Sequence, residues 1–126
     1  MISGIGTDIV QINRIRENLE QHGERFAKRI LSDNEFQDFE KHKTQHAFLA
    51  KRFAAKEAAV KALGTGFRHG ISMKHIIVEH DQWGKPILVF TDAALEVATQ
   101  QKISQSHLSI ADEKEFAVAY VVLEKS

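Results

Sequence analysis

Hydrophobic and polar positions alternate along the first segment of the chain. Ile5, Thr7 and Ile9 fall on one set of alternate positions, while two glycines and Asp8 fall on the other. This period of two predicts a strand over residues 2–10. Glycines in a strand leave its backbone open to close approach, here directly beside the carboxylate of Asp8.

Apolar residues at helical spacing predict three helices before residue 64. The first covers residues 13–21 and ends at Gly23. The second opens at Ser32-Asp33-Asn34-Glu35, which has the pattern of a capping box. The third runs from about residue 46 to residue 63, is rich in alanine and ends at Gly64. Between the first two lies a short basic segment, residues 25–31.

The second half of the chain is richer in predicted strands. The expected elements are strands over 75–80 and 86–90 around a turn at 81–85, a helix capped by Thr91 that reaches about Gln101, and a hairpin of 107–111 and 116–123 around the turn 112–115. Helices are mostly early and antiparallel strands mostly late. This order predicts an α+β fold in which an antiparallel sheet packs with helices.

Length and composition narrow the class of protein. The 126 residues suit one domain, residues 1–126. Seventeen basic and seventeen acidic residues give no net charge, so we expect neither a nucleic-acid nor a membrane partner. The absence of cysteine excludes disulfides, thiol nucleophiles and cysteine-based zinc sites, and fits a cytoplasmic protein. We expect no signal peptide, because the first residues lack a basic region followed by a long apolar run, and no run of about 18 apolar residues is present that could span a membrane.

Two carboxylates are candidates for chemistry. Asp8 lies beside glycines in an apolar strand, and Glu57 lies in the alanine-rich helix. Together they could hold Mg²⁺, with oxygens of a substrate completing its coordination. The alternative is structural: Glu57 and Lys61 have the i,i+4 spacing of a surface ion pair, and Asp8 could cap a turn. Spacing alone favours this structural interpretation.

The same helix also carries three basic residues, and two glycines follow its end. Arg52, Lys56 and Lys61 could bind a polyphosphate, or they could form a solvated face. The segment Gly64-Thr65-Gly66 could expose N–H groups to a phosphate, although a helix C-cap is the commoner role of such glycines. Earlier in the chain, several basic residues around Phe26 form either an ordinary surface or a docking patch for an acidic protein. The seven histidines lack zinc-ligand spacing.

Five segments taken together resemble the small bacterial holo-acyl-carrier-protein synthases, a 4'-phosphopantetheinyl transferase family. They are Gly4-Ile5-Gly6-Thr7-Asp8-Ile9-Val10, Arg14-Ile15, Leu31-Ser32-Asp33-Asn34-Glu35, Arg52-Phe53-Ala54-Ala55-Lys56-Glu57-Ala58 and Lys61-Ala62-Leu63-Gly64-Thr65-Gly66. Gly84-Lys85-Pro86 and the strand 117–124 also match. Each segment alone is weak, but their order and spacing in combination are specific.

The resemblance implies the 4'-phosphopantetheinyl transferase fold and a reaction. The phosphopantetheine arm of coenzyme A passes to a serine of apo acyl carrier protein, in fatty acid biosynthesis, and adenosine 3',5'-bisphosphate leaves. Asp8 and Glu57 would bind Mg²⁺, and Lys61 would contact the pyrophosphate or assist proton transfer. The residues implied to line the coenzyme A site are Arg52, Lys56, Lys61, Gly64, Thr65, Gly66 and Pro86. Those implied to meet the carrier protein are Arg14, Arg25, Phe26 and Arg29.

The chain departs from the family pattern at one place, and the general base and the function each have alternatives. Many members of the family carry a nucleotide-contacting histidine where this chain has Ile110-Ala111-Asp112-Glu113-Lys114, so the roles of Asp112 and Lys114 are unassigned. The general base could be a metal-bound water, Lys61 or a carboxylate. A non-catalytic binding module and a purely structural domain are the alternative functions.

The resemblance also implies a homotrimer with its active sites at the subunit interfaces. The strand 116–123 is apolar on both of its faces, so it needs cover on both sides. A second subunit could cover one of these faces. Alternatively, helices of the same chain could cover both.

Overall fold

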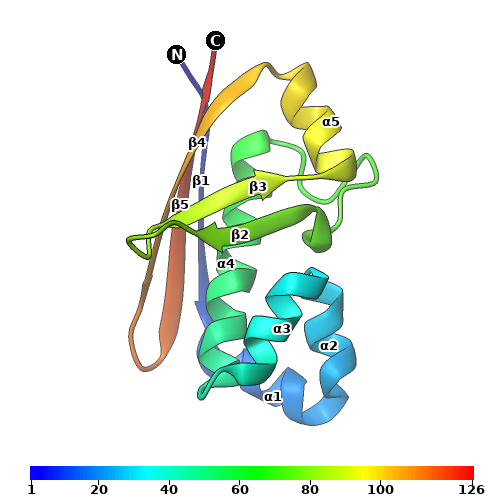
Figure 1. Cartoon of the computed structure of the whole chain (residues 1–126), viewed down its shortest axis with the longest axis vertical. Coiled ribbons are helices and arrows are strands. Elements are labelled where there is room, and N and C mark those ends of the chain that lie inside the picture. The colour runs from blue at the N-terminus through cyan, green and yellow to red at the C-terminus, as the bar shows by residue number, and fades with distance from the viewer.

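The computed structural model describes residues 1–126 and contains five strands, five α-helices and one 3₁₀ turn. Figure 1 shows their arrangement. In chain order they are β1 (Ile2–Gln11), α1 (Ile12–His22), α2 (Glu24–Ile30), α3 (Asp33–Lys41), α4 (Gln45–Leu63), η1 (Met73–His75), β2 (Ile76–His80), β3 (Pro86–Phe90), α5 (Asp92–Gln100), β4 (Ile103–Asp112) and β5 (Phe116–Lys125). The α+β class with antiparallel sheets is confirmed.

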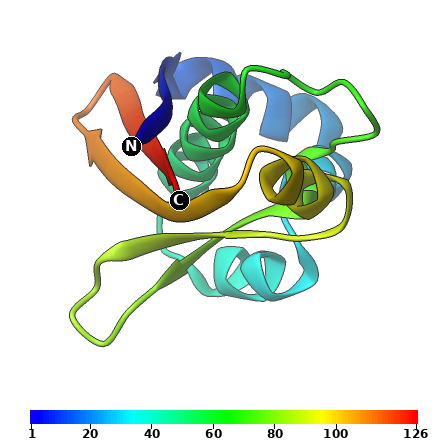
Figure 2. The same ribbon diagram turned by 90° about the horizontal axis from the view of Figure 1, so that it is seen from above.

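Two antiparallel sheets flank the long helix. The larger has the strand order β1–β5–β4, with Asp8 opposite Ala119, and the smaller is the hairpin of β2 and β3. Seen from above, α4 lies at the centre, with the larger sheet on one side and the other helices around it (Figure 2). Because α4 is covered from several directions, residues all round its circumference are buried.

Close contact between β1 and α4 depends on two glycines. A Cβ atom built on Gly4 would lie 1.9 Å from the carbonyl oxygen of Ala62, and one on Gly6 would lie 2.0 Å from that of Ala58. Both distances are far below van der Waals contact, so only glycine allows the strand to lie this near the helix. The same close contact brings Asp8 within hydrogen-bond distance of Lys61 on α4.

The sequence predicted most element boundaries to within a few residues. The basic segment 25–31 is largely the helix α2, whose Ala27 and Ile30 are buried. The final hairpin is longer than predicted. Thr91 stands at the expected N-cap of α5, but its hydroxyl donates to the carbonyl of His75 (3.1 Å) and does not cap the helix. None of the helices combines the length and apolar character needed to cross a membrane.

Candidate functional site

Strand β1 and helix α4 bring Asp8 and Lys61 together. Lys61 Nζ donates to Asp8 Oδ1 at 3.1 Å and to the carbonyl oxygen of Thr7 at 3.0 Å. Asp8 pairs within the strand opposite Ala119, so the interpretation of Asp8 as a turn cap is wrong. The ion pair of Lys61 is with Asp8, and Glu57 contributes no ion pair on the helix surface.

Glu57 lies one helical turn before Lys61 and is partly buried. Burial raises the pKa of its carboxyl group, the negative charge of Asp8 adds to this rise, and Lys61 opposes it. The two carboxylates therefore repel each other, which a cation between them would relieve. No group of three or more acidic or histidine side chains surrounds them. Two carboxylates are the usual protein share of a Mg²⁺ site completed by substrate phosphates, so the pair fits Mg²⁺.

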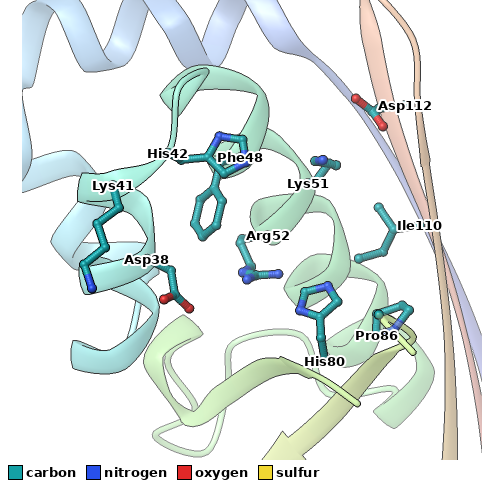
Figure 3. A pocket seen from close by; sticks show the side chains of 11 residues that line it. Asp38, Lys41, His42, Phe48, Lys51, Arg52, His80, Pro86, Ile110 and Asp112 are labelled. Carbon is teal, nitrogen blue, oxygen red and sulfur yellow. The ribbon is translucent and has the colours of Figure 1, made fainter. Parts of the chain in front are cut away.

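A cavity of about 560 Å³ opens beside the amino-terminal half of α4 (Figure 3). Its walls come from α3, α4, the β2–β3 hairpin and the end of β4. The lining residues are Asp38, Lys41, His42, Phe48, Lys51, Arg52, His80, Gly84, Pro86, Ile110 and Asp112. The cavity brings together Arg52 and Pro86, which the sequence analysis assigned to one ligand site. Asp112 also lines it, whereas Lys114 does not.

Arg52 is a buried cation in the wall of this cavity, with 6% of its surface exposed. Its guanidinium lies over the ring of Phe48 at 4.5 Å, and Nε lies 3.7 Å from Oε2 of Glu35 without a hydrogen-bond partner. Burial lowers the pKa of Arg52, while the carboxylates of Glu35 and Asp38 raise it. A desolvated guanidinium facing a cavity is a binding group for an anion.

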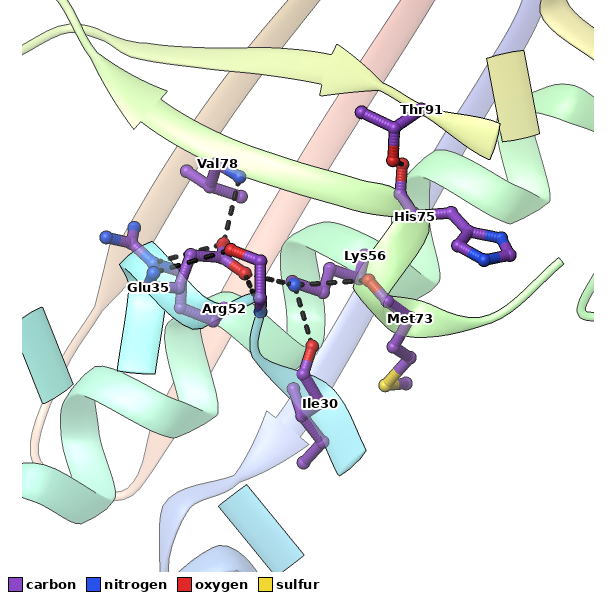
Figure 4. A network of polar contacts seen from close by, with 9 residues as sticks. Ile30, Glu35, Arg52, Lys56, Met73, His75, Val78 and Thr91 are labelled. Atoms are coloured by element: carbon purple, nitrogen blue, oxygen red, sulfur yellow. Dashed lines mark hydrogen bonds and ion pairs between the residues drawn. The ribbon is translucent and has the colours of Figure 1, made fainter. Parts of the chain in front are cut away.

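Lys56 does not line a ligand site, and its assignment from the sequence is wrong. The side chain is fully buried, and Nζ donates to the carbonyl oxygens of Ile30 (2.7 Å) and Met73 (3.1 Å) and to Glu35 (Figure 4). With three donors used and no exposure, Lys56 can neither reach coenzyme A nor form part of a solvated face. The sequence predicted only a capping role for its partner Glu35.

The Gly64–Gly66 segment closes α4. Gly64 has a φ of 80°, and its N–H group donates to the carbonyl of Val60 at 3.0 Å. The N–H group of Gly66 donates to the same carbonyl at 3.4 Å, and the hydroxyl of Thr65 donates to the carbonyl of Gly66 at 2.9 Å. The C-cap alternative is therefore confirmed, and the N–H groups of the two glycines are already used. The segment nevertheless lies close to Lys61 in the chain, because Gly64 follows Lys61 by about one helical turn.

The expected docking residues lie on α1 and α2. Arg14, Arg25 and Arg29 are exposed and form no ion pair within the chain, and Phe26 is partly buried between α2 and its neighbours. Their positive charge is therefore available to another molecule.

Comparison with known proteins identifies the family. The family model described as the 4'-phosphopantetheinyl transferase superfamily matches residues 4–121. The chain belongs to this superfamily. It is 50% identical over 125 residues to a holo-[acyl-carrier-protein] synthase of Vibrio cholerae serotype O1, covering 99% of each chain.

Solved structures of this superfamily share the fold. The holo-[acyl-carrier-protein] synthase of Neisseria meningitidis superposes with a TM-score of 0.94 at 44% identity, over 99% of this chain and all of that one. A holo-(acyl-carrier-protein) synthase of Bacillus anthracis in complex with CoA (3',5'-ADP) gives a TM-score of 0.84 at 44% identity, over 100% and 99% of the two chains.

Proposed function

We propose that this protein is a holo-acyl-carrier-protein synthase. It transfers the 4'-phosphopantetheine group of coenzyme A to a serine of apo acyl carrier protein in fatty acid biosynthesis. The serine oxygen forms a bond to the β-phosphorus, the bond from that phosphorus to the bridging oxygen breaks, and adenosine 3',5'-bisphosphate leaves. The hydroxyl proton is lost to a base. Half the residues are identical to a synthase across almost the entire chain, and this observation carries the proposal.

Asp8 and Glu57 are the proposed ligands of Mg²⁺. Burial and the negative charge of Asp8 both raise the pKa of Glu57, and a cation between the two carboxylates would offset both effects. When bound, Mg²⁺ would neutralise charge on the phosphoryl oxygens. Lys61 is held at Asp8 by an ion pair at 3.1 Å and is half exposed, so its ammonium group can contact the pyrophosphate or the leaving phosphate.

The cavity beside Arg52 is the proposed binding site for coenzyme A. Arg52 precedes Glu57 by five residues, so the two side chains are about 7.5 Å apart along the axis of α4 and about 140° apart around it. Coenzyme A would therefore have to extend from the cavity round the helix for its pyrophosphate to reach the carboxylates. Pro86 contributes an apolar wall to the cavity. Gly64, Thr65 and Gly66 would border the opposite end of the site, beyond Lys61.

The arginines of α1 and α2 are the proposed contacts for the carrier protein. Arg14, Arg25 and Arg29 are exposed and unpaired, so an acidic partner surface would meet three free positive charges. Phe26 lies among them and offers an apolar contact.

The outer face of the larger sheet supports the proposed homotrimer. Ile5, Ile9 and Tyr120 are 69%, 65% and 53% exposed on the face that α4 does not cover. A contiguous apolar face of this kind is typical of a subunit interface. Active sites shared between neighbouring subunits belong to the same proposal, as does a cytoplasmic location.

The mass of the carrier protein tests the function. Incubation with the enzyme, coenzyme A and Mg²⁺ should increase the mass of apo acyl carrier protein by one phosphopantetheine group. Binding of coenzyme A with no mass gain would instead make the protein a non-catalytic binding module. If the protein neither binds coenzyme A nor increases the mass of the carrier protein, it is a structural domain.

A further inference from the structure

Glu35 is a buried carboxylate that joins three elements, and the reaction described above does not use it. It belongs to the first turn of α3 and is 2% exposed. Oε1 accepts from the N–H group of Ser32 (2.9 Å) and from Lys56 Nζ, and Oε2 accepts from the N–H group of Val78 (2.9 Å). The same Oε2 lies 3.7 Å from Arg52 Nε (Figure 4).

These contacts give each carboxylate oxygen a different neighbouring cation. Lys56 takes Oε1, and Arg52 faces Oε2. At 3.7 Å the contact with Arg52 Nε is too long for a hydrogen bond, but it is an ion pair between groups removed from water. The carboxylate therefore attracts the guanidinium without occupying its terminal nitrogens.

The charges of the buried group do not cancel. Glu35 carries one negative charge, whereas Lys56 and Arg52 carry two positive charges. Elsewhere in the cavity wall the negative charges of Asp38 and Asp112 balance the positive charges of Lys41 and Lys51. Since all three donors of Lys56 are used inside the protein, the surplus positive charge of the group is presented to the cavity by Arg52.

We propose that Glu35 is a positioning residue, which together with Lys56 holds the guanidinium of Arg52 at the cavity wall, ready to bind a phosphate of coenzyme A. The proposal rests on the proposed function, because it takes this cavity as the coenzyme A site. The aromatic ring of Phe48 limits the guanidinium on a second side, at 4.5 Å. Arg52 thus keeps one orientation before the ligand arrives, which reduces the entropic cost of binding.

The test removes the charge of Glu35 together with that of Lys56, so that Arg52 loses its ion pair and no unpaired ammonium group stays in the core. Glu35→Gln alone would strand the ammonium group of Lys56, so the main variant combines Glu35→Gln with Lys56→Met, which keeps both side-chain sizes. We expect the KM for coenzyme A, and its Kd from titration calorimetry, to rise about tenfold. The kcat and the KM for the carrier protein should stay within about twofold of wild type, because Arg52 binds only one substrate.

Arg52→Met provides the decisive comparison. If Glu35 acts through Arg52, the triple variant Glu35→Gln/Lys56→Met/Arg52→Met has the same KM for coenzyme A as Arg52→Met alone. Val97→Ala, on the buried face of α5, is the control for stability. It should lower the melting temperature and leave both KM values unchanged.

Three outcomes would overturn the proposal. They are an unchanged KM for coenzyme A in the double variant, a further rise of that KM in the Arg52→Met background, and an equal rise of both KM values. If the double variant does not fold, Glu35→Asp replaces it, since aspartate keeps the charge but withdraws it from Arg52 by one methylene. An unchanged KM in Glu35→Asp would then contradict the positioning role. Failure of the wild-type protein to modify the carrier protein would refute the proposed function instead.

Discussion

Burial separates the roles of two lysines that lie five residues apart on α4. Lys56 Nζ is enclosed by Glu35 and two backbone carbonyl oxygens and has no contact with solvent. Lys61 Nζ is half exposed and holds Asp8 at 3.1 Å. Water can replace the contact of Lys61 with Asp8 at little cost, whereas it cannot reach Lys56. Lys61 can therefore exchange Asp8 for a ligand, while Lys56 stays within the core.

Loss of either carboxylate should abolish most of the activity. We expect Asp8→Ala and Glu57→Ala each to lower kcat/KM at least about 100-fold, because each removes a charge that would help hold Mg²⁺ at the pyrophosphate, an effect of about 3 kcal/mol. Glu57→Gln keeps the shape of the side chain but loses its charge, so it should fail to a similar degree. The measurement is the rate of carrier-protein modification over a series of Mg²⁺ concentrations.

Glu96→Gln, on the exposed side of α5, is the matched control and should behave as wild type. Circular dichroism melts establish that each variant is folded. Near-normal Mg²⁺-dependent turnover in either alanine variant would show that the metal site lies elsewhere.

At the level of single residues, the sequence predicted some members of the site and missed the burial of others. The motifs and their resemblance selected Asp8, Glu57 and Lys61, whose mutual approach the structure supports. Helical spacing placed Arg52 and Lys56 on one stripe of α4, but it could not reveal that α3 and β2 cover that stripe. No sequence signal indicated that Glu35 bonds with Lys56 and Val78, because these contacts span 21 and 43 residues of chain.

Among the elements, β1 and α4 together set the geometry of the site. The strand is held to the helix at Gly4 and Gly6, and the ion pair between Asp8 and Lys61 follows from that close contact. The alternating pattern predicted the strand, and the open backbone beside Asp8 was expected from its glycines. Which element would fill that open space could not be predicted, because the helix lies some fifty residues later in the chain.

Gly6→Ala should separate the strand from the helix. Its Cβ would lie 2.0 Å from the carbonyl oxygen of Ala58, and backbone on both sides must move to admit it. We expect a loss of about 1–3 kcal/mol in the free energy of unfolding, typical of overpacking. Activity should fall further than stability explains, since Asp8 moves away from Lys61. Ser3→Ala, at an exposed position of the same strand, should change neither property.

Denaturant unfolding and steady-state rates measure the two effects of Gly6→Ala separately. A variant that unfolds at the wild-type denaturant concentration would show that the contact is not tight. Full activity in a destabilised variant would show that the site does not depend on this register.

The helices α1 and α2 should serve the carrier protein alone. Arg14→Glu, Arg25→Glu or Arg29→Glu should raise the KM for the carrier protein about tenfold, or about 1.4 kcal/mol, and leave the KM for coenzyme A nearly unchanged. Added salt should lower the wild-type rate at low carrier-protein concentration, because it screens these exposed charges. Lys102→Glu, an exposed charge reversal after α5, is the control. An equal loss toward both substrates would instead indicate a role in folding or in the nucleotide site.

For the whole molecule, the uncovered face of the larger sheet decides the expected assembly. Strand β5 is apolar on both faces, as the sequence indicated, and α4 covers only the face that carries Ala117, Ala119, Val121 and Leu123. The other face, with Ile5, Ile9 and Tyr120, is exposed within one chain. Pattern alone could not distinguish cover by the chain's own helices from cover by another subunit.

The isolated protein should therefore sediment as a trimer at micromolar concentration. Ile9→Lys would place a charge on the uncovered face and should shift the protein towards monomer, with a loss of activity if the sites need two subunits. Sedimentation velocity and specific activity on the same samples check both effects. A wild-type monomer with full specific activity would contradict the trimer.

Mixed trimers test whether each site draws on two subunits. In a ring of three, every interface joins different surfaces of neighbouring chains, so Asp8 and Glu57 of one chain would face the docking arginines of the next. At a carrier-protein concentration well below the wild-type KM, a Glu57→Ala chain and an Arg14→Glu/Arg25→Glu chain should each show little activity alone. After random exchange at equal amounts, about one quarter of the sites combine an intact Glu57 with an intact arginine pair from the neighbour, so about a quarter of the wild-type activity should return. Mass spectrometry of the intact trimers verifies that exchange has occurred. Exchange without recovery would place the entire site within one chain.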